Sequence, residues 1–342
     1  LRLAAAGYAA GLLARDLSYK IGLVRPLRLG ARVISVGNIT LGGTGKTPAV
    51  IHLARYFHAR GERVAVLLRG HGGERLGGVN VVHDGLQRCL GVDEVGDEAV
   101  LLADRLGDVP VLAGKDRRLT GAAAVEEFGA SVVLLDDGFQ YRRLAIDEHI
   151  VLLDATQPFG NGRLFPAGTL RDPPSYLARA QQIWITRTDH PGAMAPEALR
   201  AKVARVAPEV PVYRTRHLPA RLWRFPSGQP VELARLAGRK IMGMAGIGNP
   251  SAFWATLQGL QVAELVPEPF PDHHRYQQPE IVEVVRRAEQ AGCEAVVTTE
   301  KDAVRLDLWP AGGPELWVLG IELVFEGAAP EWPEGVARDD PN

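Results

Sequence analysis

A glycine-rich segment near the N-terminus, VISVGNITLGGTGKTPA at residues 33–49, constrains the fold of this 342-residue chain more than any other stretch. The apolar run that opens it predicts a buried parallel strand, and residues 48–60 predict a helix. A strand, a glycine-rich turn ending in Gly45-Lys46-Thr47, and a helix are typical of a phosphate-binding P-loop. A glycine-rich turn without a ligand is the alternative.

The loop itself supplies the residues expected to hold a nucleotide. Its glycines let backbone N–H groups close around phosphate oxygens, and Lys46 would reach the β- and γ-phosphates. The Thr47 hydroxyl would ligate Mg²⁺. The first glycine of the usual P-loop pattern is replaced by Thr40. The expected nucleotide contacts in this loop are Thr40, Leu41, Gly42, Gly43, Thr44, Gly45 and Lys46.

Composition narrows the class of protein. The chain is 46% hydrophobic and 23% charged, which is typical of a globular protein. Its formal net charge of −1 argues against a general nucleic-acid binder. The two cysteines, Cys89 and Cys293, lie far apart, which suits a reducing compartment and excludes a cysteine-based zinc site.

The first residues form a basic, weakly apolar segment. The run 3–14 is too short to span a bilayer, which needs about 20 residues. A basic helix with an apolar face can lie in the headgroup layer of an anionic leaflet, or it can pack on the domain as an ordinary helix. The residues alone do not decide between the two.

Acidic residues at three places are candidates for the chemistry of the site. Asp136 and Asp137 end a buried strand at 130–135, where a P-loop enzyme holds Mg²⁺, although an ordinary Asp-Gly turn has the same pattern. Asp97 opens a helix, which the helix dipole alone would favour. In the C-terminal half, Asp272 precedes His273, and a His held by a carboxylate can relay a proton or simply lie in a surface loop.

Strands that alternate with helices predict a doubly wound parallel α/β sheet with a second, smaller α/β lobe. Residues 206–236 are rich in Arg and Pro and are expected to be an irregular join. The expected division is an N-terminal membrane-associated helix at 1–30, a P-loop core at 31–205, the join, a smaller lobe at 237–326 and a frayed tail at 327–342.

Taken together, these motifs resemble the tetraacyldisaccharide 4′-kinase family of lipid A biosynthesis. The resemblance covers nearly the whole chain in order, and Thr40 is usual for the family. Asp172 stands where Glu is usual, His71 where Tyr is frequent, and Tyr141 where His is frequent. The motifs that carry the resemblance are VGNIT and GGTGKTP, RG and GG at 69–73, VGDE, DDGFQ, GNGR and PAG, AGIG, FPDHH and TTEKD.

The resemblance implies transfer of the γ-phosphoryl group of ATP, with Mg²⁺, to the 4′-hydroxyl of a tetraacyldisaccharide 1-phosphate. It implies that Asp97 is the general base and that His273 assists it from the second lobe, so that lobe closure would be part of catalysis. Thr47 with Asp136 or Asp137 would organise Mg²⁺. The expected additional phosphate or metal contacts are Arg117, Gln140 and Asp172.

The family's substrate stays in the membrane, so the resemblance favours an N-terminal helix that brings the site to the cytoplasmic face of the inner membrane. No nucleic acid and no obligate protein partner are expected. One rival is a P-loop GTPase or metal-chaperone ATPase, since Thr186-Arg187-Thr188-Asp189 faintly resembles a guanine-reading motif. Another is a non-catalytic, membrane-associated nucleotide sensor, which would need neither Asp97 nor His273.

Overall fold

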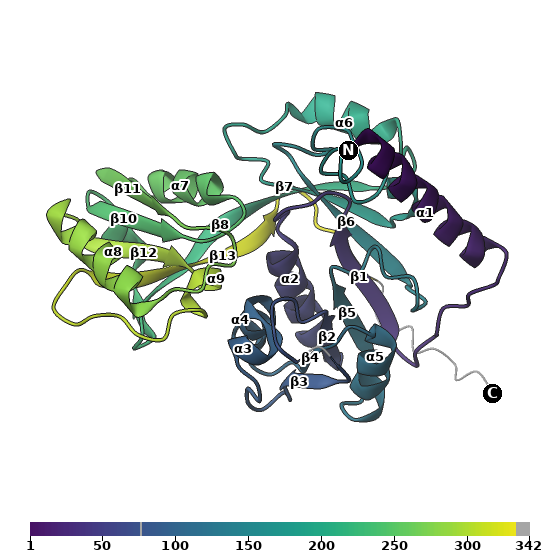
Figure 1. The fold of residues 1–342 in the computed structure, drawn as a ribbon, viewed down its shortest axis with the longest axis horizontal. Helices are drawn as coiled ribbons and strands as arrows, with labels where there is room; N and C mark the ends of the chain where they lie inside the picture. The colour runs from purple at the N-terminus through teal and green to yellow at the C-terminus, as the bar shows by residue number, and fades with distance from the viewer. Residues whose placement is uncertain (76, 333–342) are drawn as a thin grey trace. The chain divides into compact units, whose positions relative to one another are not determined.

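The computed structural model describes residues 1–75 and 77–332, and its chain divides into two compact units (Figure 1). Unit 1 contains residues 1–216 and the segment that begins at Val324, and unit 2 contains His217–Leu323. These bounds differ from the expected smaller lobe at 237–326, because the strands β8 and β13 contribute residues to both units.

Unit 1 is built on a sheet with the strand order β8-β7-β6-β1-β5-β2-β4-β3. Its neighbours pair in parallel from β8 to β4, and β3 pairs antiparallel with β4. The parallel strands therefore end at one edge, where ligands bind in such sheets. The strands are β1 (Arg32–Asn38), β2 (Val64–Leu68), β3 (Asn80–His83), β4 (Val111–Ala113), β5 (Val132–Asp136), β6 (Glu148–Asp154), β7 (Gln182–Thr186) and β8 (Val212–Arg224).

Helices cover both faces of the unit 1 sheet. Ala123 and Ala124 of α5 pack in one cluster with Leu67 and Leu135, while the neighbouring side chains Val66 and Leu134, on the opposite face, are also fully buried. The helices of this unit are α1 (Arg2–Lys20), α2 (Lys46–His58), α3 (Val92–Val95), α4 (Asp97–Leu106), α5 (Arg117–Glu126), the short η1 (Pro174–Arg179) and α6 (Pro196–Ala204).

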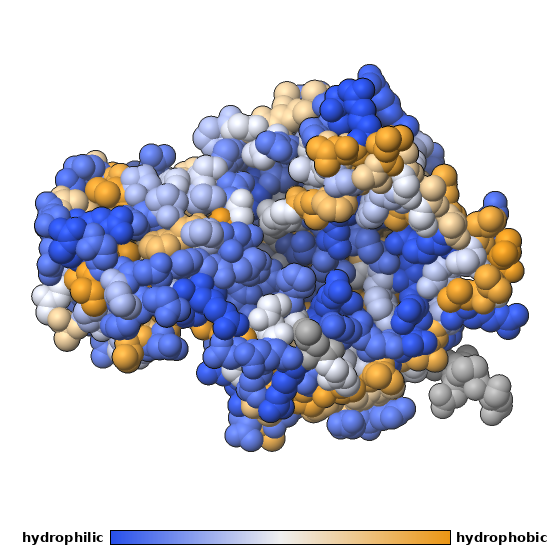
Figure 2. All heavy atoms as spheres, viewed as in Figure 1, coloured by the Kyte–Doolittle hydropathy of each residue, from blue (hydrophilic) through white to orange (hydrophobic). Residues whose placement is uncertain are grey.

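The N-terminal helix α1 exposes apolar side chains. Leu12 is its buried residue, whereas the exposed large apolar residues of this region include Leu3, Leu13, Leu17, Ile21 and Leu23. Figure 2 shows apolar surface where α1 lies in Figure 1. Among the described helices, none combines the length and hydrophobicity that crossing a membrane requires.

Unit 2 has its own sheet, with the strand order β11-β10-β12-β13-β8 and β9 paired with β8. Its apolar core includes Ile241, Leu257, Val297 and Trp317. The elements that begin in this unit are β9 (Gln229–Val231), η2 (Leu233–Leu236), β10 (Lys240–Ala245), α7 (Pro250–Gly259), β11 (Glu264–Pro269), α8 (Gln278–Gln290), β12 (Ala295–Thr299), α9 (Glu300–Ala303) and β13 (Glu315–Phe325).

The expectation of an irregular join at 206–236 is wrong, because β8 is a strand of 13 residues within it. Thr215 and Leu222 are its buried side chains, and most other positions are partly or fully exposed. A strand with so few buried apolar residues, and with a proline at 219, lacks the hydrophobic pattern that identifies strands in a sequence.

The expectation of a frayed tail from residue 327 is wrong at Trp332, while residues 333–342 lie outside the described part of the chain. The Trp332 ring is 6% exposed and lies 4.8 Å from the Tyr56 ring between centroids. Its indole N–H donates to the buried Glu148 carboxylate at 2.9 Å. A buried indole usually finds such a polar partner, and this contact holds the end of the described chain against β6.

Candidate active site

The loop between β1 and α2 has the conformation that its glycines permit. Gly42 and Gly45 have φ of 103° and 88°, in the left-handed region that favours glycine. Lys46 is the first residue of α2 and Thr47 the second, so both lie at the end of a helix whose first N–H groups have no partner within the helix. Such a helix start attracts anions, phosphate among them.

Two side chains at the end of β7 and directly after it hydrogen-bond to the backbone of this loop. The Thr186 hydroxyl donates to the Thr44 carbonyl at 2.9 Å, and the Arg187 guanidinium donates to the Gly43 carbonyl at 2.8 Å. Arg187 also pairs with Asp154 at the end of β6. The stretch that resembled a guanine-reading motif thus supports the backbone of the phosphate loop.

Asp136 is the last residue of β5 and is 3% exposed. Its Oδ1 atom has no hydrogen-bond partner among the described residues. Burial, followed by the negative charge of Glu98, raises the pKa of Asp136 to about 7, and the nearby Lys46 opposes that rise. A buried carboxylate oxygen without a donor is costly, and a bound cation would satisfy it.

Asp137 has a different environment, although it is the next residue. Its φ of 52° turns the chain, and the Arg171 guanidinium donates to its two oxygens at 2.9 and 3.0 Å. Lys46 Nζ lies 3.8 Å from its Oδ1. Burial alone would raise the pKa of Asp137, but Lys46 and Arg171 outweigh it, so the pKa lies below its usual value.

Gln140 and Asp172 form a second buried pair beside the loop. The Gln140 amide donates to Asp172 Oδ2 at 2.6 Å and to the Asn38 carbonyl at 2.8 Å. Asp172 is fully buried, and its Oδ1 faces Arg15 of α1 at 3.7 Å. No group of three or more His, Cys, Asp or Glu residues in the described chain is arranged to hold a metal. A cation there would therefore need other oxygens, such as phosphates, beside Asp136.

Arg117 and Asp97 are both buried at the starts of helices, Arg117 at 7% and Asp97 at 5% exposure. Arg117 Nε has no hydrogen-bond partner among the described residues, and its guanidinium lies 5.0 Å from the Tyr141 ring centroid. Burial lowers the pKa of Arg117, while the charge of Asp137 opposes this shift. Asp97 Oδ1 accepts the N–H of Glu98 at 2.9 Å.

In unit 2, the adjacent histidines His273 and His274 have different partners. His273 Nε2 lies 3.4 Å from Lys301 Nζ and 3.8 Å from Asp272 Oδ2, and its φ of 58° is unusual for a non-glycine residue. His274 Nε2 instead lies 3.0 Å from a Glu280 oxygen.

The loop that carries His273 is anchored by the fully buried Asp302. Asp302 accepts hydrogen bonds from the Gly246 N–H, the Tyr276 hydroxyl and the Arg305 guanidinium at 2.7 to 2.9 Å. The His273 N–H in turn donates to the Gly246 carbonyl at 3.2 Å. Asp97 and His273 belong to different units, and their pairing stays a prediction.

Comparison with known proteins places this geometry in a family. The model of the tetraacyldisaccharide-1-P 4′-kinase family, LpxK, matches residues 1–336. The chain belongs to the LpxK family. A tetraacyldisaccharide 4′-kinase of Anaeromyxobacter dehalogenans strain 2CP-C is 43% identical over 324 residues, which are 94% of this chain and 85% of that protein. One from Syntrophus aciditrophicus is 44% identical over 87% of this chain and 82% of that protein.

Among solved structures, the chain is similar to the "apo" form of Aquifex aeolicus LpxK in complex with ATP. The TM-score is 0.75 with 28% identity, over 96% of this chain and 94% of that one. The predicted α/β, P-loop-type fold and the resemblance to this family are therefore confirmed.

Two residues that contact this site were missed by sequence reasoning. Arg171 binds Asp137, and Arg187 supports the loop at Gly43. Arg171 directly precedes the candidate residue Asp172, and this adjacency was the signal that could have identified it. Arg187 was considered only as part of a guanine-reading motif. The individual roles expected of the other site residues stay predictions.

Proposed function

We propose that this protein transfers the γ-phosphoryl group of ATP to the 4′-hydroxyl of a tetraacyldisaccharide 1-phosphate, an intermediate of lipid A biosynthesis. The observation that supports this proposal most directly is a P-loop whose Lys46, at the start of α2, lies beside Asp136 and Asp137 at the end of β5, in a chain of the LpxK family. The 4′-oxygen attacks the γ-phosphorus, the bond to the β-phosphate oxygen breaks, and ADP leaves.

The phosphate loop binds and orients the donor. The N–H groups at the start of α2 and the Lys46 ammonium face the triphosphate, and this positioning supplies much of the rate in phosphoryl transfer. In the structure Lys46 Nζ lies 3.8 Å from Asp137 Oδ1, so Asp137, whose carboxylate Arg171 holds in place, keeps the lysine near the loop before the nucleotide arrives.

The residues present fit Mg²⁺. Asp136 offers a buried oxygen that no described residue satisfies, and Thr47 offers a hydroxyl on the first turn of α2. Bound with the nucleotide, Mg²⁺ would neutralise charge on the phosphate oxygens. We propose Asp136 rather than Asp137 as the carboxylate ligand, because both Asp137 oxygens already accept hydrogen bonds from Arg171. Gln140 and Asp172 would position the loop through Asn38.

Asp97 is the proposed general base and takes the proton of the 4′-hydroxyl. It is buried at the start of α4, where a carboxylate keeps a fixed position. His273 is proposed to assist it, and Arg117 to contact a phosphate, because a buried guanidinium nitrogen without an acceptor suits an anion.

The acceptor is an acylated lipid, so the enzyme must reach a membrane surface. We propose that α1 lies on the cytoplasmic leaflet of the inner membrane, with exposed residues such as Leu13 and Leu17 in the acyl boundary. Basic residues of α1, among them Arg2 and Lys20, would favour anionic headgroups.

The test mixes purified protein, labelled ATP, Mg²⁺ and tetraacyldisaccharide 1-phosphate in detergent micelles. Wild type should form a bisphosphorylated lipid. Asp97→Asn, which keeps size but loses basicity, should lower kcat by about 10² to 10⁴ with little change in the KM for ATP. Its matched control, Asp104→Asn, changes the same group later in α4, on a side chain paired with Arg88, and should keep full activity.

Other outcomes would change the assignment. Transfer that survives Asp97→Asn would keep the kinase and discard the base. Nucleotide binding without any lipid product would favour the nucleotide sensor, and a preference for GTP would favour the GTPase.

A further inference from the structure

The N-terminal helix α1 packs on unit 1 through a stripe that contains polar side chains. The positions of α1 that are buried or half-buried recur three or four residues apart, so they share one face of the helix. They include Tyr8, Leu12, Arg15, Asp16 and Tyr19. Leu12 is the fully buried one, and the other four carry polar groups. The helix therefore contacts the unit through hydrogen bonds and charges as well as through apolar packing.

Asp16 attaches this helix to the unit. Its two oxygens accept hydrogen bonds from the Arg142 guanidinium and the Tyr176 hydroxyl. These two partners lie two and four residues beyond Gln140 and Asp172 in the chain. The helix is consequently attached close to the buried pair that lies beside the phosphate loop.

The neighbouring residue, Arg15, faces a buried charge. Asp172 is fully buried, and its Oδ1 has no hydrogen-bond partner among the described residues. Arg15 Nη2 lies 3.7 Å from that oxygen, and in the described chain Arg15 is the cation at ion-pair distance from Asp172. A buried carboxylate is costly without an opposite charge, so Arg15 stabilises Asp172 in its buried position.

Asp172 in turn holds the start of the phosphate loop. Its Oδ2 accepts the Gln140 amide at 2.6 Å, and that amide also donates to the Asn38 carbonyl at 2.8 Å. The Asp172 backbone N–H donates to the Ile39 carbonyl at 3.3 Å. Asn38 ends β1 and Ile39 is the next residue, so both carbonyls belong to the backbone that leads into the loop. A displaced Asp172 would weaken the contacts that fix this backbone.

A second contact of α1 reaches the charged groups at the loop. The Tyr8 hydroxyl donates to the Arg171 carbonyl at 2.8 Å. The Arg171 guanidinium donates to Asp137, whose carboxylate lies 3.8 Å from Lys46 Nζ. Two successive residues, Arg171 and Asp172, thus connect α1 to the two sides of the phosphate loop.

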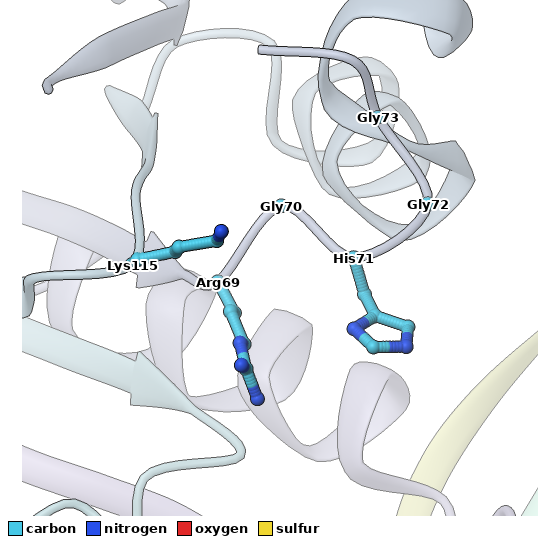
Figure 3. A pocket seen from close by; sticks show the side chains of 6 residues that line it. All are labelled: Arg69, Gly70, His71, Gly72, Gly73 and Lys115. Atoms are coloured by element: carbon cyan, nitrogen blue, oxygen red, sulfur yellow. The ribbon is translucent and has the colours of Figure 1, made fainter. Parts of the chain in front are cut away.

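These contacts are separate from the pocket that Figure 3 shows. Residues 69–73 and Lys115 line that pocket, in the loops after β2 and β4. The residues that α1 holds follow other strands, because Gln140 comes after β5 and Asp172 after β6. β5 and β6 are the two neighbours of β1 in the sheet. The contacts of α1 therefore concern the part of the sheet edge where the phosphate loop begins.

We propose that α1 is a structural part of the nucleotide site and that Arg15 is a positioning residue for ATP. Arg15 holds Asp172 in place. Asp172 and Gln140 hold the backbone that leads into the phosphate loop, and this backbone sets the loop that binds the phosphates. The inference rests on the proposed function for the identity of the nucleotide. Removing the Arg15 charge weakens ATP binding through Asp172.

The test is calorimetry of a non-hydrolysable ATP analogue with Mg²⁺, in detergent micelles without acceptor. Arg15→Gln should raise the Kd about fivefold or more, because a buried carboxylate that positions the loop loses its counter-charge. Arg15→Lys keeps the charge and should recover most of the affinity. Arg25→Gln, which removes an exposed positive charge shortly after α1, is the matched control and should bind as wild type does.

A double-variant cycle tests whether Arg15 acts through Asp172. Arg15→Gln and Asp172→Asn each leave one charge of the pair without its partner, whereas the double variant removes both. The loss of binding free energy in the double variant should therefore be smaller than the sum of the single losses. Thermal denaturation would show that each variant is folded at the temperature of the titration.

Tyr8→Phe is a milder test of the same helix. It removes only the hydroxyl that donates to the Arg171 carbonyl, and it should raise the Kd about threefold. This variant keeps both charges of the Arg15–Asp172 pair, so it tests the role of α1 even if Arg15→Gln does not fold.

These measurements need no phosphoryl transfer, so they remain decisive if the protein phosphorylates no lipid. An unchanged Kd in Arg15→Gln and Tyr8→Phe would overturn the proposal, and a lower thermal stability with that unchanged Kd would show that α1 only packs on the unit. An equal loss in Arg25→Gln would reveal a general effect of charge. Additive losses in the cycle would show that Arg15 does not act through Asp172.

Discussion

Replacing Trp332 by Phe should destabilise unit 1 although the substitution keeps an aromatic ring. The indole N–H donates to both Glu148 oxygens, at 2.9 and 3.1 Å, and Phe removes that donor while the carboxylate stays buried. A hydrogen bond to a charged group contributes about 1.5 to 3 kcal/mol, and we expect a loss of that size. Trp332→Ala also removes ring contacts with Tyr56 and Phe57, and should cost about 3 to 5 kcal/mol.

The assay is urea unfolding followed by circular dichroism, on wild type, Trp332→Phe, Glu148→Gln and the double variant. If the bond matters, the double variant should lose less than the sum of the single losses. Additive losses, or a loss below about 0.5 kcal/mol for Trp332→Phe, would refute the reasoning. The KM for ATP, measured where all variants are folded, should not change, because Glu148 lies at the start of β6 and not at the end where the phosphate loop follows β1.

Three further changes test the site and its support. Gly37→Ala places a Cβ 2.6 Å from that of Phe139, and should lower the free energy of unfolding by about 1 to 3 kcal/mol in thermal denaturation; no loss would contradict the packing. Burial, with nearby arginines, lowers the pKa of His149 to about 4, so the unfolded chain binds a proton that the folded one does not between about pH 6.5 and 4. Stability should therefore fall as pH falls through that window, and it should fall less in His149→Gln. If the urea midpoint shifted equally in wild type and in His149→Gln between pH 7 and pH 5, this expectation would be contradicted. Arg187→Gln loses its bond to the Gly43 carbonyl and should raise the KM for ATP several-fold in initial-rate kinetics, and an unchanged KM would contradict that support.

The features that the sequence predicted well are local ones. Glycines 42 and 45 adopt the left-handed φ that a phosphate loop requires, and the buried strand before Asp136 is a short apolar run. Such patterns arise within a few residues, so a sequence displays them directly. The same local reasoning failed for β8, because its side chains are mostly exposed and its apolar residues are few.

The contacts that organise the site are not local. Arg171 binds Asp137 from 34 positions away, and Arg187 reaches Gly43 from 144 positions away. Arginines are frequent on any surface, so nothing in the local sequence distinguishes these two. The strand order decides which loops meet at one sheet edge, and a single sequence does not specify that order.

Asp136 and Asp137 show how identical neighbours acquire different chemistry. Asp136 still belongs to β5, and its pairing with Val36 of β1 fixes its backbone in the sheet. Its side chain is consequently buried with an unsatisfied oxygen. Asp137 is the first residue beyond the strand, and its left-handed φ directs the chain so that its carboxylate meets Arg171 and Lys46. The end of the strand therefore separates an acid suited to a cation from an acid already neutralised by protein.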